Sequence, residues 1–303
     1  MFSGIGVEFF ILLSGFFSAF TYKDITFREY IAKKCYRLLP VHWTCLLIGA
    51  YLLGIRCGKI PYLSPVSAIL GQSLIPGCGD TNPPSWTLST LFILYILTPS
   101  LYKYYRNINK KHLMPIAVFL SVVSTFLNSL FYNPEHKFMF WFLYVSPYYR
   151  IVTYTIGMFV GLYVKNSRTE NTRFNSSFSE VLSLMCLFCS IYFLRKAAGF
   201  WYTLPLVLVI LSFAKPCRGI VSGVLTVKPL LNISKLSFCF YLIHFPILQY
   251  VEYILSKYEI QSTYILLMVV FVSFCASLLA ANVLHRYVEI PATKYRIVKL
   301  EKL

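Results

Sequence analysis

Long apolar runs recur along the whole chain and restrict its fold more than any other feature of the sequence. They fall at about residues 5–22, 40–57, 86–104, 113–132, 147–164, 180–195, 199–215, 236–255 and 262–284. A helix of about 20 apolar residues spans the ~30 Å hydrocarbon core of a bilayer. Charged residues make up only 13% of the chain, whereas soluble domains carry roughly a quarter. The sequence therefore predicts an all-α fold, a polytopic transmembrane helical bundle of about nine spans.

Basic residues are concentrated in alternate loops between these runs. The chain has 28 Lys and Arg against 11 Asp and Glu, a formal net charge of +17. Cytoplasmic loops of membrane proteins are enriched in Lys and Arg, so the charge indicates topology, and we expect no nucleic-acid partner. The asymmetry predicts a cytoplasmic C-terminus. Nine spans then place Met1 outside, and a tenth helix ahead of it would restore the parity.

Neither repeats nor linkers divide the sequence, and we expect a single membrane domain over residues 1–303 with no appended soluble domain. The nine Cys residues are scattered, mostly inside apolar runs. Cys186 and Cys189 stand inside the apolar run 180–195, and no Cys/His spacing suggests a metal, so no metal site is expected. G-x-S-x-G, Walker A and HExxH motifs are also missing from the sequence.

Two cations and an aromatic residue stand together in the segment FREYIAKKCYRLLPVHW (27–43). Lys34 and Arg37 would share one face of a helix, Pro40 is expected at the start of the following span, and His42 follows at the interface. Such cations could bind a phosphate-bearing ligand. Ordinary anchoring of a membrane boundary by basic and aromatic residues is the alternative, and composition alone favours it.

An acidic residue and a small pair interrupt the first apolar run, VEFFILLSGFF (7–17). Ionisable groups at membrane depth are costly and often functional. Glu8 either snorkels or pairs with a neighbouring helix, or belongs to a site, and the residues do not decide between these readings. Ser14 and Gly15 would permit close helix packing or a bend.

Two further segments contain polar residues at positions of interest. In NPPSWTLSTLFILYILTP (82–99), Ser85 is expected to cap the helix that begins at Trp86, itself an interfacial anchor. In LSFCFYLIHFPILQYVEY (236–253), His244 lies well inside a span, two residues before Pro246. Histidine suits proton transfer near neutral pH, although a buried His is often only a partner in a helix–helix hydrogen bond.

In order along the chain, the segments VEFFILLSGFF, KKCYRLLPVHW, PSWTLSTLFILYILTP, LSFCFYLIHFP and RYVEIP resemble the motifs of the acyltransferase-3 family of integral membrane acyltransferases. The family pattern reads FFxxSGF, RxxRxxPxxW, SWSLxxE, SYxxYLxH and aromatic-x-E-x-P. No single motif is distinctive, but the five occur in the family's order over nearly the whole chain.

The resemblance implies roles for matched residues. Lys34 and Arg37 fall on the family's cation pair and would meet the phosphates of acyl-CoA at the cytoplasmic mouth. His244 falls on the motif histidine and is the expected catalytic base, with His42 as the fallback. The remaining matches are motif positions in the pocket or the framework: Glu8, Ser14, Gly15, Ser85, Trp86 and Glu289.

For the whole chain, the resemblance implies an enzyme of the cell (inner) membrane. It would transfer an acyl group from cytoplasmic acyl-CoA, with acetyl-CoA the expected donor, to a hydroxyl of an extracytoplasmic polysaccharide such as O-antigen, capsule, exopolysaccharide or peptidoglycan. No bound cofactor is expected. The expected partners are acyl-CoA, a cell-surface glycan or lipid-linked oligosaccharide, and membrane lipids.

Two departures from the family pattern leave alternatives open. Family members have ten spans, and the first carries an Arg and, ten residues later, a His expected to be the catalytic base. That span is missing from this sequence, and Leu91 stands where the family has Glu. A catalytically impaired family remnant is therefore one alternative. A transporter or flippase for a lipid-linked glycan is another, although it would predict internal repeats that the sequence does not show.

Overall fold

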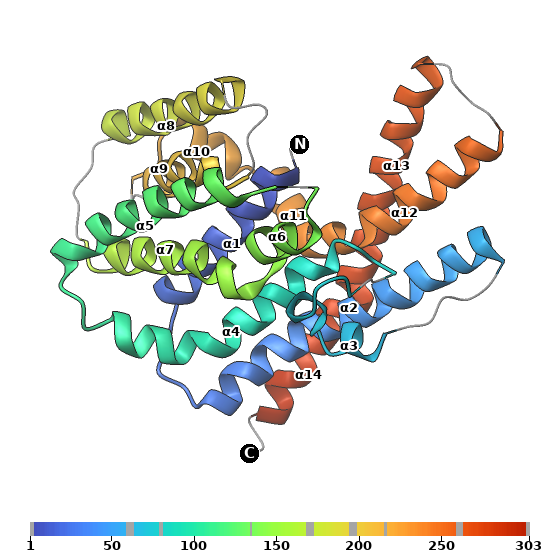
Figure 1. The fold of residues 1–303 in the computed structure, drawn as a ribbon, viewed down its shortest axis with the longest axis horizontal. Coiled ribbons are helices and arrows are strands. Elements are labelled where there is room, and N and C mark those ends of the chain that lie inside the picture. Colours follow the sequence, from blue (N-terminus) through green and yellow to red (C-terminus); the bar gives the residue numbers. More distant parts are fainter. Residues whose placement is uncertain are drawn as a thin grey trace. The chain divides into compact units, whose positions relative to one another are not determined.

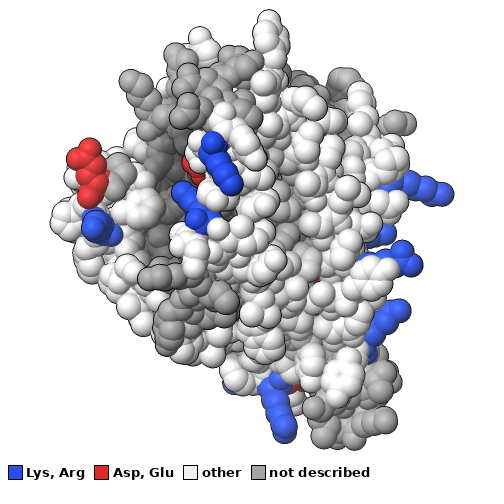
Figure 2. Space-filling view, turned by 90° about the vertical axis from the view of Figure 1, so that its right-hand side faces the viewer, with Lys and Arg blue, Asp and Glu red and all other residues white. Residues whose placement is uncertain are grey.

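The computed structural model describes residues 3–58, 64–78, 81–133, 135–167, 173–193, 199–214, 217–258 and 263–300, and all regular secondary structure within them is helical (Figure 1). Five helices are long and apolar enough to cross a membrane: Phe27–Cys57, Lys110–Phe131, Asn175–Phe193, Ser237–Lys257 and Tyr264–Tyr295. Most described residues on the face shown in Figure 2 are neither acidic nor basic. The chain is therefore a helical membrane protein.

Within the described residues, each of the nine expected spans overlaps helical structure, and positions 194–195, 215 and 262 of those spans lie outside the described residues. The number of membrane crossings stays a prediction. The chain forms two compact units, Met1–Asp24 with Ile93–Lys228 and Ile25–Phe92 with Pro229–Leu303. Helix α4 (Ser85–Tyr105) contributes its first turns to the second unit and the remainder to the first. Both units are therefore built from segments that lie far apart in the sequence.

The first unit is a bundle in which α7 packs against both α1 and α5, while α9 packs against α8. Besides the end of α4, its elements are α1 (Ser3–Phe20), α5 (Lys110–Phe131), α6 (Lys137–Phe140), the π-helix η2 (Trp141–Val145), α7 (Pro147–Lys165), α8 (Arg173–Phe193), the 3-10 helix η3 (Gly199–Tyr202), α9 (Thr203–Phe213) and α10 (Ile220–Leu225). Ser146 caps α7 by accepting a hydrogen bond from the Tyr148 amide at 3.1 Å, and Pro147 occupies the first helical position.

Three glycines allow the backbones of α1 and α7 to cross closely. A Cβ on Gly15 would overlap the carbonyl of Tyr154, one on Gly157 would overlap the carbonyl of Leu12, and one on Gly161 that of Phe16. Small residues let membrane helices approach in this way, which gains van der Waals contact where no hydrophobic force acts between helices. Gly15 of the first apolar run therefore allows this close packing.

The second unit is organised around α2, which packs against α12 and α14, while α12 and α13 run antiparallel to each other (Figure 1). Besides the start of α4, its elements are α2 (Phe27–Cys57), α3 (Pro65–Ala68), the 3-10 helix η1 (Gln72–Leu74), α11 (Lys228–Lys235), α12 (Ser237–Lys257), α13 (Thr263–Leu284), the π-helix η4 (His285–Glu289) and α14 (Ile290–Leu300).

Helix α2 begins earlier than the sequence predicted. Pro40 was expected at the start of the span, but it lies inside a helix that starts at Phe27. Thr26 caps that start, because its hydroxyl accepts a hydrogen bond from the Glu29 amide at 3.2 Å. The basic segment and the apolar run therefore form one continuous helix, which places Lys34 and Arg37 on the same rigid element as His42.

Gly15→Ala should destabilise the protein, because the added methyl group meets the backbone of α7. Overpacking of this kind costs about 1–3 kcal/mol, measurable as a lower midpoint of thermal or SDS-induced unfolding. Gly6→Ala is the matched control on the same helix, since no atom lies within 4 Å of the methyl group it would add. Equal effects of the two substitutions would contradict the close crossing.

Candidate functional site

The cations of the predicted donor site share one face of α2 in the second unit. Lys34 is partly buried, with its Nζ 5.3 Å from the centroid of the Tyr30 ring, and Arg37 is exposed. Arg37 Nε lies 3.7 Å from Glu289 Oε1. The C-terminal motif residue therefore orients one of the two cations by an ion pair that joins α2 to η4.

Glu289 is also the acceptor at the centre of a buried cluster. Its Oε2 accepts from His285 Nδ1 at 2.7 Å and from the Cys239 thiol at 3.3 Å. The side-chain atoms of these three residues that could bind a metal ion lie within 4.8 Å of one another. A thiol, an imidazole and a carboxylate can together bind Zn²⁺. Hydrogen bonds already join the three side chains, so the geometry does not require an ion.

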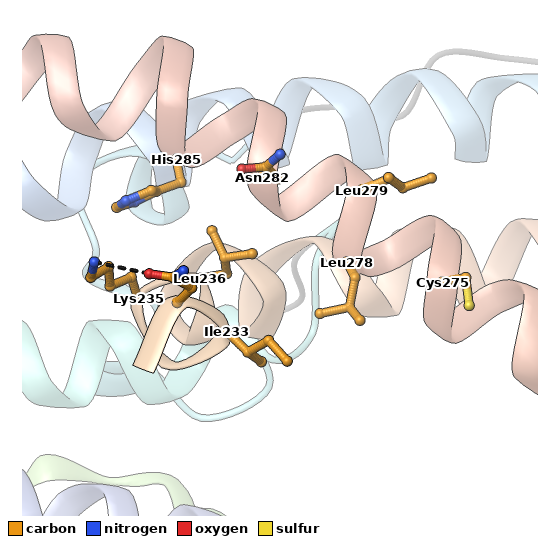
Figure 3. Close-up of a pocket in the computed structure, with 9 residues that line it drawn as sticks. Ile233, Lys235, Leu236, Cys275, Leu278, Leu279, Asn282 and His285 are labelled. Carbon is orange, nitrogen blue, oxygen red and sulfur yellow. Dashed lines mark hydrogen bonds between the residues drawn. The ribbon is translucent and has the colours of Figure 1, made fainter. Parts of the chain in front are cut away.

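A cavity of about 680 Å³ opens beside this cluster, between α11 and α13. Its floor is apolar, whereas Lys235 and His285 lie at one end and Cys275 at the other (Figure 3). The Nζ of Lys235 donates to Asn232 Oδ1 at 3.2 Å. An apolar groove with a cation at one end suits an amphipathic ligand.

His244 lies on α12, partly buried, with its ring next to those of Phe240, Tyr241 and Phe245. Its Nδ1 lies 2.8 Å from the carbonyl oxygen of Tyr241 and 3.2 Å from that of Phe240. A carbonyl oxygen can only accept, so Nδ1 must carry the proton. In the neutral ring Nε2 then holds the lone pair, which is the state that a general base requires.

A proline-dependent contact shapes α12 around this histidine. Pro246 has no amide hydrogen, so it cannot donate to the carbonyl of Leu242, four residues earlier. The side chain of Asn82 donates to that carbonyl at 2.8 Å. Tyr241 makes a second link, since its hydroxyl donates to Thr87 Oγ1 at 2.9 Å. The segment just before α4 and its first turn therefore hold the His244 region of α12.

His42 is fully buried, and its Nε2 lies 2.7 Å from the carbonyl oxygen of Ser67. Helix α4 begins at Ser85 itself, one residue earlier than the expected start at Trp86. The Oγ of Ser85 accepts from the side-chain Nε2 of Gln72 at 3.0 Å. These motif residues thus hold the connection between α2 and α4 in place.

Glu8 lies in the first unit and is fully buried. Its Oε2 accepts from Arg150 Nη1, and its Oε1 accepts from the hydroxyls of Thr153 at 3.0 Å and Thr203 at 2.7 Å. The structure thus agrees with the reading that Glu8 pairs with a neighbouring helix. Arg150 was not among the predicted site residues, although an arginine inside the apolar segment 147–164 is itself a signal of a buried partner.

Comparison with known proteins agrees with the motifs described above. A sequence model of the acyltransferase-3 family, described as an acyltransferase domain, matches residues 1–285. The chain belongs to the acyltransferase-3 family. It is also similar to the acyltransferase MdmB of Streptomyces mycarofaciens, with 24% identity over 274 residues, which cover 81% of this chain and 68% of that protein. No solved structure matches the chain.

Membership of the acyltransferase-3 family makes the protein an enzyme that transfers an acyl group and therefore uses an acyl donor and an acceptor. The structure brings Arg37 and Glu289 together, and it joins Asn82 and Thr87 to the turn of α12 that precedes His244. Glu8 belongs to a separate polar cluster in the first unit.

The Asn82–Leu242 hydrogen bond should matter only while residue 246 is proline. Asn82→Ala leaves a buried carbonyl without this donor, which costs about 1–3 kcal/mol. Pro246→Ala restores a backbone amide that can donate to the same carbonyl, so Asn82→Ala should cost clearly less in that background. A double-mutant cycle on the free energy of unfolding measures the difference. Equal costs in both backgrounds would show that the contact does not compensate for Pro246.

Proposed function

We propose that the enzyme moves an acyl group, acetyl in the first instance, from cytoplasmic acyl-CoA to a hydroxyl of an extracytoplasmic polysaccharide of the O-antigen, capsule, exopolysaccharide or peptidoglycan class. The proposed mechanism is based on the geometry of His244. Its Nδ1 donates to backbone carbonyls, which leaves the lone pair on Nε2, the atom that would accept a proton. Family membership supports acyl transfer as the reaction class.

His244 is the general base of the proposed reaction. Its Nε2 takes the proton from the acceptor hydroxyl while that oxygen attacks the thioester carbonyl carbon. The carbonyl oxygen carries the negative charge of the tetrahedral intermediate. Collapse of the intermediate re-forms the carbonyl and breaks the carbon–sulfur bond, and the imidazolium returns its proton to the departing CoA sulfur. The products are the glycan ester and free CoA.

Lys34 and Arg37 bind the phosphates of the donor. Arg forms directional, bidentate contacts with phosphate, whereas Lys acts as a point charge. The ion pair with Glu289 holds the Arg37 side chain, which is otherwise exposed, and reduces the conformational freedom that binding would remove. Glu289 thus contributes to donor binding through Arg37.

The location follows from the charge distribution along the sequence. An inner-membrane enzyme with a cytoplasmic C-terminus would present the first turns of α2, with Lys34 and Arg37, to the cytoplasmic CoA pool. The polysaccharide or a lipid-linked oligosaccharide would be the acceptor on the other side. Membrane lipids surround the apolar helices.

His244→Gln should abolish acyl transfer while donor binding persists. Glutamine keeps a polar side chain of similar reach but cannot accept a proton, so we expect kcat to fall about 10²–10⁴-fold. The assay follows label from acetyl-CoA into an envelope polysaccharide fraction, with donor affinity measured separately. His112→Gln, at an exposed position on α5, is the control. Wild-type activity in His244→Gln would exclude this base, and binding of donor by wild type without any transfer would exclude the proposed reaction.

Arg37→Ala should weaken donor binding rather than chemistry. Loss of a charged hydrogen bond to phosphate costs about 1.5–3 kcal/mol, so the KM for acetyl-CoA should rise at least tenfold with kcat nearly unchanged. Arg28→Ala removes an exposed arginine from the same helix and is the matched control. An unchanged KM in Arg37→Ala, or an equal increase in Arg28→Ala, would contradict the assignment.

A further inference from the structure

The cavity between α11 and α13 changes from polar to apolar along its length (Figure 3). On the α13 side it is lined by Cys275, Leu278, Leu279 and Asn282, and then by His285 of η4. These positions recur three or four residues apart, which places them on one face of a helix. Asn282 and His285 form the polar end of this face, and the two leucines continue it to Cys275. A ligand that fills the cavity must therefore be polar at one end and apolar along the rest.

The length of the cavity corresponds to one leaflet of a bilayer. From Cys275 to His285, a helical rise of about 1.5 Å per residue gives a length of about 15 Å, which is half of the ~30 Å hydrocarbon core. Both residues lie in the apolar helical segment Tyr264–Tyr295, which is long enough to cross a membrane. Leu279 is 69% exposed, so the apolar part of the cavity opens onto the protein surface, where lipid chains surround a membrane helix.

A lysine marks the polar end of the cavity. Lys235 is the last residue of α11, and α12 begins at Ser237 and runs antiparallel to α13 (Figure 1), so Lys235 lies at the level where α13 ends. An ammonium group has three N–H donors. One of them is directed at Asn232 Oδ1 at 3.2 Å, so the others can contact a phosphate. Among the described residues that line the cavity, none is acidic, and the polar end therefore carries a positive charge that a ligand can neutralise.

We propose that this cavity is a binding site for one anionic phospholipid. The headgroup phosphate contacts the Lys235 ammonium, and one acyl chain lies along Leu278 and Leu279 toward Cys275. Basic pockets between membrane helices bind anionic headgroups in this way. A soluble phosphate compound would leave the apolar part of the cavity unfilled, and a lipid without net charge would leave the lysine uncompensated. The site lies within the second unit and does not depend on the proposed acyl transfer.

The test compares two lipids and four variants of the full-length protein in detergent. Dioleoylphosphatidylglycerol is anionic, whereas dioleoylphosphatidylcholine has the same chains and no net charge. Lys235→Ala removes the cation, and Lys228→Ala makes the same change at the exposed first residue of α11, outside the cavity. Leu278→Trp obstructs the apolar part, and its control is Leu267→Trp, at a position of α13 that is 65% exposed and outside the cavity. Native mass spectrometry measures the number of bound lipids and the Kd of each, and the thermal midpoint reports folding.

Wild type and Lys228→Ala should bind one phosphatidylglycerol several-fold more tightly than phosphatidylcholine. Lys235→Ala should weaken phosphatidylglycerol binding about fivefold, the loss expected for one lysine facing an anionic lipid, and leave phosphatidylcholine binding nearly unchanged. Leu278→Trp should weaken binding of both lipids, and Leu267→Trp of neither.

Equal affinity of wild type for the two lipids overturns the proposal, and so do equal losses in Lys235→Ala and Lys228→Ala, which would indicate attraction to the surface charge as a whole. Displacement of the lipid by an excess of glycerol phosphate overturns it in favour of a phosphate site that holds no chain, and displacement by coenzyme A in favour of a donor site. If Leu278→Trp does not fold, the lysine variants and the two lipids decide. A failure of acyl transfer with these lipid affinities as expected bears only on the proposed function.

Discussion

The buried ion pair between Glu8 and Arg150 is the interaction on which the first unit depends. Removing one partner of such a pair leaves an uncompensated charge and costs about 3–5 kcal/mol. The pair lies on the two helices that cross most closely, and Gly15 and Gly157 each lie about two turns along from the charged residue of their own helix. Glycines set the distance between these backbones, and the charges restrict which faces can meet.

In the second unit, the need to satisfy backbone hydrogen-bonding groups within the protein shapes helix α12. Inside a membrane protein, a backbone carbonyl that loses its helical donor must find another within the chain. Pro246 creates such a carbonyl at Leu242, and Asn82 supplies the donor. His244 stands between these two positions and turns its Nδ1 to the backbone. A missing backbone hydrogen bond and a defined tautomer thus arise in the same turns of α12.

Glu289 links the C-terminal motif to helix α2. Its two oxygens are divided between neighbours: Oε1 faces Arg37, whereas Oε2 accepts from His285 and Cys239. The cluster and the cation therefore form one connected network. The network therefore joins α2, α12 and η4 within the second unit.

The sequence by itself determined that this is a helical membrane protein of the acyltransferase-3 family, because long apolar runs are a local property and the five motifs can be read in order. It also identified Glu8 as a costly charge within an apolar run, and His244 as a histidine two residues before a proline. Only the tertiary structure showed that the partner is Arg150, that Glu289 meets Arg37 and Cys239, and that Asn82 reaches Leu242. These contacts join residues far apart in the chain, and their existence depends on the directions in which side chains leave packed helices, which hydropathy and spacing do not encode.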